Sequence, residues 1–126
     1  MLNIIYIEDQ RRPERNHEFK EVIHKLGFQD IILFCDDISI ENISTLANDG
    51  VICHSGMAGY NIIKHFAKEN KWPLLSYSGA VGSTHILQEN SFTKNHFSVD
   101  SDYFEFVLPE FIERCKSIKE SKNNDD

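Results

Sequence analysis

Two short loops of the chain share the pattern Ser-Gly-x-x-Gly, running from Ser55 to Gly59 and from Ser78 to Gly82. Four of the six glycines lie in these loops. Glycine lets backbone N–H groups come close to a ligand, and such a loop beside the start of a helix can bind an anion. The pattern indicates a small pocket for a phosphate, a carboxylate or a nucleotide fragment, unless the residues serve only tight turns and helix capping. The candidate contacts are Ser55, Gly56, Gly59, Gly79, Gly82 and Ser83.

Carboxylates and one imidazole form the second group of candidate residues, because they follow apolar runs. The pair Glu8 and Asp9 follows the first run, and His54 follows the third. Two carboxylates could hold a divalent cation such as Mg²⁺, which prefers oxygen ligands. The imidazole could accept a phosphoryl group on nitrogen, act as a general base, bind a metal or form a pH-sensitive contact. It could equally be a buried, hydrogen-bonded side chain that Asp9 holds in one tautomer.

The elements that must position these residues alternate between apolar runs and helical patterns. The apolar runs predict strands over residues 2–7, 31–35, 51–53, 74–77 and 92–97. Helical spacing predicts helices over residues 13–26, 40–47, 62–70, 84–89 and 103–112, of which the fourth is short, and Pro109 should kink or split the last. This order predicts an α/β fold with a doubly wound, five-stranded parallel sheet. In that fold, functional residues lie beyond the carboxyl ends of the strands.

Length and charge limit the classes of function. The chain has 126 residues, which suits one domain over residues 1–115 followed by a polar C-terminal tail over residues 116–126. The net charge of −7 argues against nucleic acid or an anionic membrane surface as a partner. Three cysteines predict no disulfide framework, and neither a signal peptide nor a membrane-spanning run is expected. We therefore expect a reduced, cytoplasmic domain, whose carboxylates form an acidic mouth that favours a cation or a basic partner surface.

The order of polar residues at the strand ends resembles that of response-regulator receiver domains, which have a CheY-like (flavodoxin-like) fold. The resemblance covers residues 1–115. Glu8 and Asp9 match the acidic pair that binds Mg²⁺ in that family. His54 stands at the phosphoacceptor position, three residues before Met57. The resemblance implies a receiver-like domain with a shortened fourth helix.

Two further positions match the same family, and three depart from it. Ser78 matches the hydroxyl residue after the fourth strand, and Lys94 matches the lysine near the end of the fifth. His54 replaces the aspartate phosphoacceptor, and Ala58 and Asn95 replace two prolines. An imidazole cannot form an acyl phosphate, and it is a poor ligand for Mg²⁺. The resemblance therefore implies a pseudo-receiver without ordinary aspartate phosphorylation, with a degenerate pocket of Glu8, Asp9, His54, Ser78 and Lys94. In that pocket Lys94 could pair directly with Asp9 or Glu8.

Three functions remain open from the sequence. The first is a pseudo-receiver of the two-component type, a signalling and protein-interaction module without catalytic residues. The second is a sensor of a small ligand that uses the two Ser-Gly-x-x-Gly loops. The third, which has least support, is a phosphoryl-transfer or hydrolytic enzyme with His54 as nucleophile or base.

A protein partner or a second copy of the chain is expected at the surface of the predicted fifth strand and last helix. Phe104, Phe106 and Phe111 cannot all face one stripe of the core, and excess apolar residues can mark an interface. The alternative is that these large side chains cover a sheet left bare by the short fourth helix.

Overall fold

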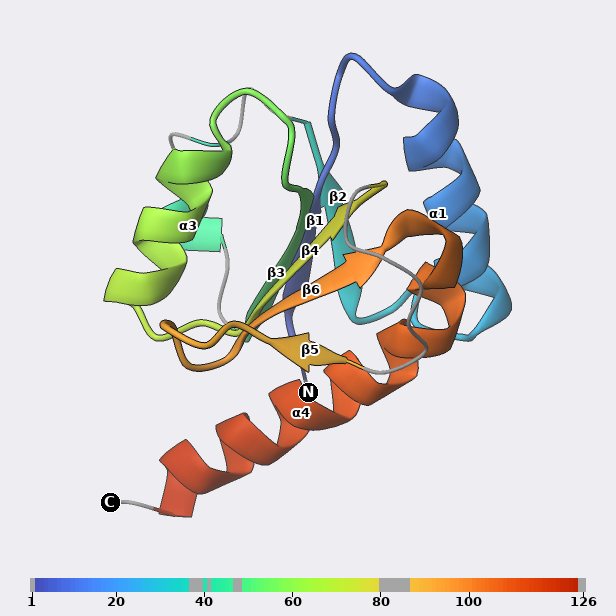
Figure 1. The fold of residues 1–126 in the computed structure, drawn as a ribbon. Coiled ribbons are helices and arrows are strands. Elements are labelled where there is room, and N and C mark those ends of the chain that lie inside the picture. The colour runs from blue at the N-terminus through green and yellow to red at the C-terminus, as the bar shows by residue number, and fades with distance from the viewer. Residues whose placement is uncertain (1, 37–39, 41, 47–48, 80–86, 125–126) are drawn as a thin grey trace.

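The computed structural model describes residues 2–36, 40, 42–46, 49–79 and 87–124, which form one six-stranded sheet with helices on both faces (Figure 1). The strand order is β2-β1-β3-β4-β6-β5. All neighbouring strands are parallel except β5 and β6, which are antiparallel. The strands are β1 (Ile4–Ile7), β2 (Ile32–Cys35), β3 (Gly50–His54), β4 (Leu74–Ser78), β5 (Gln88–Glu89) and β6 (His96–Asp100).

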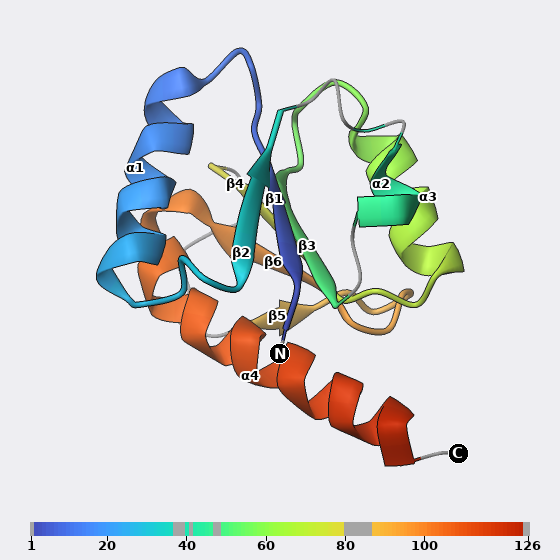
Figure 2. The ribbon, with the colours of Figure 1, turned by 180° about the vertical axis from the view of Figure 1, so that it is seen from behind.

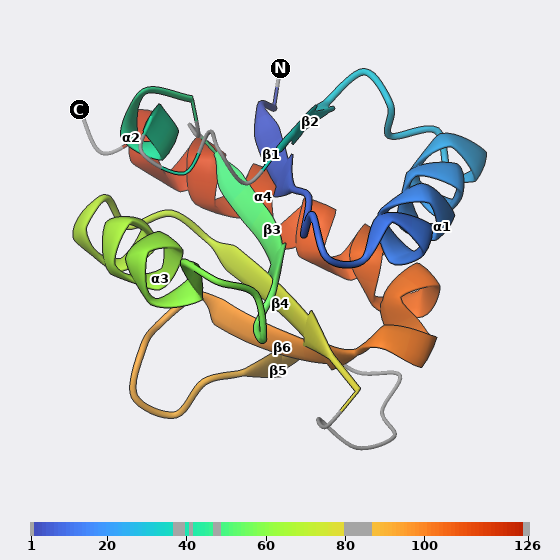
Figure 3. The ribbon, with the colours of Figure 1, turned by 90° about the horizontal axis from the view of Figure 1, so that it is seen from above.

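The helices form two outer layers. In Figure 2 and Figure 3, α1 (Pro13–Lys25) and α4 (Phe104–Asn124) cover one face of the sheet. The other face is covered by α2 (Ile43–Leu46) and α3 (Tyr60–Glu69). A 3-10 turn over Ser101–Tyr103 joins β6 to α4. This arrangement confirms the predicted α/β class and leaves the two ends of the sheet accessible to ligands.

Local sequence signals account for the limits of α1. Pro13 occupies its first turn, where the missing N–H of proline costs no hydrogen bond. Phe19 and Ile23, four residues apart, are both buried against the sheet. Gly27 follows the helix with a φ of 83°, the left-handed conformation that ends many helices and that favours glycine.

Aromatic rings form the centre of the core between the sheet, α1 and α4. Tyr6 of β1 and Tyr77 of β4 lie on either side of β3, and their ring centroids are 6.1 Å apart. Phe19 of α1 stacks on Phe104 of α4 at 3.9 Å and meets Tyr77 edge-on at 4.7 Å. All four side chains are at most 1% exposed. The ring cluster therefore packs both helices against β1 and β4, which end at the candidate site.

The sheet differs from the prediction at its last two strands. It has six strands and is mixed, because Gln88 and Glu89 pair antiparallel with β6 in a region where a helix was predicted. The remaining part of that predicted helix, residues 84–86, lies outside the described residues. β6 begins at His96 and not at residue 92, and it is flanked by β4 and β5, so it is not an edge strand. Pairing between strands, of β5 with β6 and of β6 with β4, determines both differences, rather than the local sequence pattern.

The last helix is longer than the sequence predicted. α4 runs from Phe104 through Pro109 to Asn124 without interruption, so the proline does not split it. Residues 116–124, expected as a frayed tail, continue this helix, and Lys119 of this segment pairs with Asp49 at 3.2 Å. Among the described residues, no helix has both the length and the apolar character needed to cross a bilayer.

Candidate functional site at the carboxyl ends of the strands

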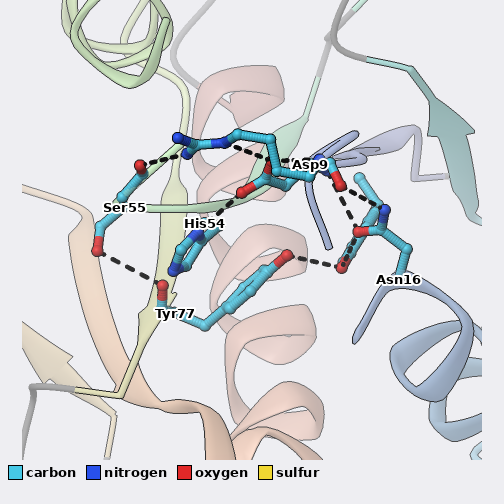
Figure 4. A network of polar contacts seen from close by, with 8 residues as sticks. Asp9, Asn16, His54, Ser55 and Tyr77 are labelled. Atoms are coloured by element: carbon cyan, nitrogen blue, oxygen red, sulfur yellow. Dashed lines mark hydrogen bonds and ion pairs between the residues drawn. The ribbon is translucent and has the colours of Figure 1, made fainter. Parts of the chain in front are cut away.

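His54 and Asp9 form a buried pair between the ends of β3 and β1 (Figure 4). The Nδ1 atom of His54 lies 3.0 Å from Oδ2 of Asp9, and the two side chains are 10% and 1% exposed. A carboxylate can only accept a hydrogen bond, so Nδ1 is the donor. His54 also stacks on the ring of Tyr77, with centroids 5.2 Å apart. One edge of the imidazole ring is therefore hydrogen-bonded to Asp9, and one face packs against Tyr77.

The second oxygen of Asp9 is bound by Arg11, two residues further along the same loop. Oδ1 accepts from the backbone N–H of Arg11 at 3.0 Å and lies 3.4 Å from its Nε. The guanidinium also donates to the backbone carbonyl of Gly56 at 2.7 Å. Arg11 therefore connects the loop after β1 with the loop after β3, across the buried carboxylate.

These contacts lower the pKa of Asp9. Burial by itself would raise the pKa, because the charged form loses water. The hydrogen bonds from the backbone and side chain of Arg11 and from His54 outweigh burial, and the pKa falls below its ordinary value. Asp9 is therefore a bound anion in the folded protein.

A second set of hydrogen bonds fixes the backbone of Asp9 (Figure 4). Asn16 of α1 donates from Nδ2 to the Asp9 carbonyl at 2.9 Å and accepts from the Asp9 N–H at 3.2 Å. The Tyr6 hydroxyl lies 3.3 Å from Oδ1 of Asn16 and 2.8 Å from the Tyr77 hydroxyl. Burial raises the pKa of Tyr77 to about 12. The two phenols therefore stay neutral and act as hydrogen-bonding groups.

A pocket of about 680 Å³ opens in front of this network. The described residues that line it are Arg11, Arg12, His54, Gly56, Ser78 and Gly79. They include two arginines, one imidazole and one hydroxyl, and none of them carries a carboxylate. The prediction of an acidic mouth is therefore wrong for this pocket. The charged groups that line the pocket favour an anion.

The described side chains do not fit a Mg²⁺ site. Both oxygens of Asp9 accept hydrogen bonds from Arg11 and His54, and the positive charge of Arg11 beside them disfavours a second cation. Glu8 lies on the other side of the loop, where it lines a separate depression of about 220 Å³ with Lys20. No cluster of three or more potential metal ligands occurs among the residues with described positions. Glu8, which was predicted to hold an ion together with Asp9, therefore lines a different depression from the one in front of Asp9 and His54.

Lys94 is not part of this site. It precedes β6, whose first residue, His96, pairs with Leu74 at the start of β4. The carboxyl end of β6 is Asp100, which pairs with Ser78. Lys94 is therefore at the opposite end of the sheet from His54, and the ion pair expected between Lys94 and Asp9 or Glu8 is wrong.

The two Ser-Gly-x-x-Gly loops contribute unequally. Ser55 is half-buried, with its hydroxyl 3.5 Å from the Tyr77 carbonyl. Gly59 precedes α3 with a φ of 86°, and a Cβ there would lie 2.8 Å from Ile40, so this glycine serves the turn. Gly56 and Gly79 line the pocket. Gly82 and Ser83 lie outside the described residues.

Sequence reasoning missed the arginines of this pocket. Arg11 and Arg12 directly follow the acidic pair, in the sequence Glu-Asp-Gln-Arg-Arg-Pro. Acidic residues and arginines that are this close in one loop could have indicated a site in which the arginines neutralise the carboxylates. Asn16, one turn into α1, gave no such signal, because an asparagine at that position is more commonly exposed.

Comparison of the chain with protein-family models, with curated proteins and with solved structures found no match. No related protein therefore assigns a role to the residues of this site.

Proposed function

We propose that the chain is a pseudo-receiver: a signalling and protein-interaction module that does not take up a phosphoryl group on a carboxylate. The parallel order β2-β1-β3-β4-β6 supports it, because this is the order of flavodoxin-like sheets. The observation that carries the proposal is the closed set of contacts among His54, Asp9 and Arg11.

Each part of that set removes one requirement of receiver chemistry. His54 offers nitrogen where an acyl phosphate needs a carboxylate. Asp9 already has a cation of the chain beside it, because Arg11 contacts Oδ1 while His54 contacts Oδ2. The like charge of Arg11 repels Mg²⁺, so the carboxylate is neutralised without a metal ion.

Incubation with acetyl phosphate and Mg²⁺ should leave the protein without a phosphoryl adduct. The reason is the missing carboxylate at position 54 together with the engaged Asp9. Intact-mass spectrometry before and after hydroxylamine, which cleaves acyl phosphates, measures this. A stoichiometric adduct that hydroxylamine removes would contradict the proposal.

A His54→Asp variant sharpens the same experiment. It restores a carboxylate at the end of β3 but leaves Arg11 on Asp9 and Lys94 at the far end of the sheet. We expect it to remain unlabelled as well. Labelling of this variant would show that the histidine alone blocks the chemistry.

The partner surface that we propose lies at the start of α4. Phe106 is 61% exposed there, and its ring lies 6.2 Å from that of Tyr103. Phe104 and Phe111 are buried in the core. The exposed Phe106, beside the half-buried Tyr103 near the end of β6, supports a protein partner or a second copy at this surface.

A second candidate function is a sensor of a small anion, and the pocket in front of His54 favours it. Arg11 and Arg12 line this pocket together with Gly56 and Gly79, which have no side chains to fill it. The Arg12 side chain is exposed and forms no ion pair with a described residue. A phosphate or carboxylate group between these arginines and His54 would complete the charge balance of the pocket.

A Gly56→Val variant should abolish any thermal stabilisation by such an anion. A Cβ at position 56 would lie 3.0 Å from Cε1 of His54, so the larger side chain would fill the pocket against the imidazole. An Ala58→Val variant is the matched control, because Ala58 is exposed in the same loop and does not line the pocket. The readout is the melting temperature across a panel of phosphates and carboxylates. A stabilisation that persists in Gly56→Val would contradict the sensor function.

A further inference from the structure

A second pocket, of about 590 Å³, lies at the opposite end of the sheet from His54. It is bounded by the end of α3, the loop between β5 and β6, and the last turns of α4. Figure 1 shows the first two of these at the amino ends of the strands, away from the loops that follow β1 and β3. No described residue lines both pockets, so the two are separate sites.

Four lysines line this pocket in a chain of net charge −7. They are Lys68, Lys71, Lys94 and Lys122. The Lys122 ammonium donates to the Lys71 carbonyl at 3.3 Å, and none of the four forms an ion pair with a carboxylate of the described residues. Gathered positive charges repel one another, and a bound anion relieves that repulsion.

His96 lines this pocket, and one of its ring nitrogens is buried without a hydrogen-bond partner among the described residues. The residue is 4% exposed, and its Nδ1 atom has no hydrogen bond within the described part of the chain. Burial, together with Lys64 and Lys68, lowers the pKa of His96, so the imidazole is neutral at physiological pH. A neutral imidazole with Nδ1 protonated can donate to a ligand oxygen. An unsatisfied buried polar atom of this kind is rare in native proteins, and a ligand would satisfy it.

The backbone around the pocket is strained at two positions. Lys71 and Asn95 have φ angles of 58° and 65°, and they are the two non-glycine residues with positive φ in the described part of the chain. Both line this pocket. Such conformations cost free energy and persist where the surrounding structure holds them, commonly at binding sites.

Aromatic side chains complete the pocket. Phe92 is 97% exposed, which is unusual for a phenylalanine that is not in contact with a partner. Trp72 is 6% exposed and lies beneath the lysines. Exposed aromatic rings stack on the bases of nucleotides, and lysines bind phosphates as point charges.

We propose that this pocket binds a small organic phosphate of the nucleoside-phosphate class, with its phosphates among Lys68, Lys71 and Lys94 and its base against Phe92. A flat surface would suit a long polyanion, whereas a concave site of this volume suits a single small ligand. Asn95 and Thr93, in the same loop, can hydrogen-bond the sugar or the phosphate.

Trp72 provides the readout, because it is the single tryptophan of the chain. Titration with ADP should change its fluorescence in a saturable manner, and isothermal calorimetry should give the same affinity. Adenosine and inorganic pyrophosphate, which each supply half of the contacts, should bind at least about tenfold more weakly. Absence of saturable binding by both methods would overturn the proposal.

Charge reversal identifies the site. Lys94→Glu should weaken ADP binding about tenfold or more, because an ammonium–phosphate contact becomes a repulsion. Lys116→Glu is the matched control, since Lys116 is exposed on α4 and does not line the pocket. Equal weakening by both variants would mean non-specific electrostatics. Weakening by Arg12→Glu and not by Lys94→Glu would place ADP in the pocket beside His54. Either result would overturn the proposal.

A Phe92→Ala variant tests the base contact. It should weaken ADP binding severalfold and leave pyrophosphate binding unchanged, since only ADP carries a base. Tighter binding of a short single-stranded oligonucleotide than of ADP would overturn the proposal in favour of a nucleic-acid surface.

Discussion

Replacing Phe19 by alanine should lower the free energy of unfolding by about 4 kcal/mol, because truncating a buried aromatic side chain costs about 3–5 kcal/mol. Phe19 is 1% exposed on α1. Its ring stacks on Phe104 at 3.9 Å and meets Tyr77 at 4.7 Å. The three rings connect α1, β4 and α4, so the cavity left by alanine is bounded by separate elements that cannot all close in on it.

Chemical denaturation followed by circular dichroism measures this loss. Phe106→Ala is the matched control, because it removes the same side chain from a position that is 61% exposed. That variant should change the free energy of unfolding by less than about 0.5 kcal/mol. A similar loss for both variants would mean that the ring cluster is not the centre of the core.

Replacing Asp9 by alanine should cost about 3 kcal/mol, because it removes the acceptor of several hydrogen bonds and leaves a buried donor unsatisfied, which costs about 1–3 kcal/mol and more for charged groups. The carboxylate accepts from the backbone and side chain of Arg11 and from His54 while being 1% exposed. Alanine leaves Nδ1 of His54 buried without an acceptor. It also leaves the Arg11 guanidinium attached to the site only through the Gly56 carbonyl. Asp9→Asn keeps an acceptor oxygen and should therefore lose less stability.

The contribution of Asp9 should depend on pH. Although burial opposes it, hydrogen bonding by Arg11 and His54 puts the pKa of Asp9 in the folded protein below the ordinary value of 3.8. On acidification the unfolded chain binds this proton first, so the stabilisation is complete above pH 3.8 and is lost as the pH falls through the folded-state pKa. The stabilities of wild type and Asp9→Ala should therefore converge in acid. A difference that stays constant with pH would contradict a lowered pKa.

Local sequence signals were sufficient for the elements whose patterns are short-ranged. Pro13 and Gly27 mark the limits of α1, and the apolar runs mark β1 to β4 within one or two residues. They also placed His54 and Asp9 at the same edge of the sheet, because parallel strands end together. Nothing local could indicate β5, since two residues form a strand only when a partner is present.

The sequence by itself determined the α/β class, the mainly parallel sheet and the meeting of Asp9 with His54. The tertiary structure decided the charge of each end of the sheet. Arg11 contacts Asp9 from within the same loop, but the guanidinium reaches the Gly56 carbonyl only because the loops after β1 and β3 converge, and this places a cation in the lining of the pocket beside His54. The pairing of β6 with β4 starts at His96, which puts Lys94 with other lysines at the amino end. Residue types can be read along a chain, but the sign of a site depends on which distant charges the fold brings together.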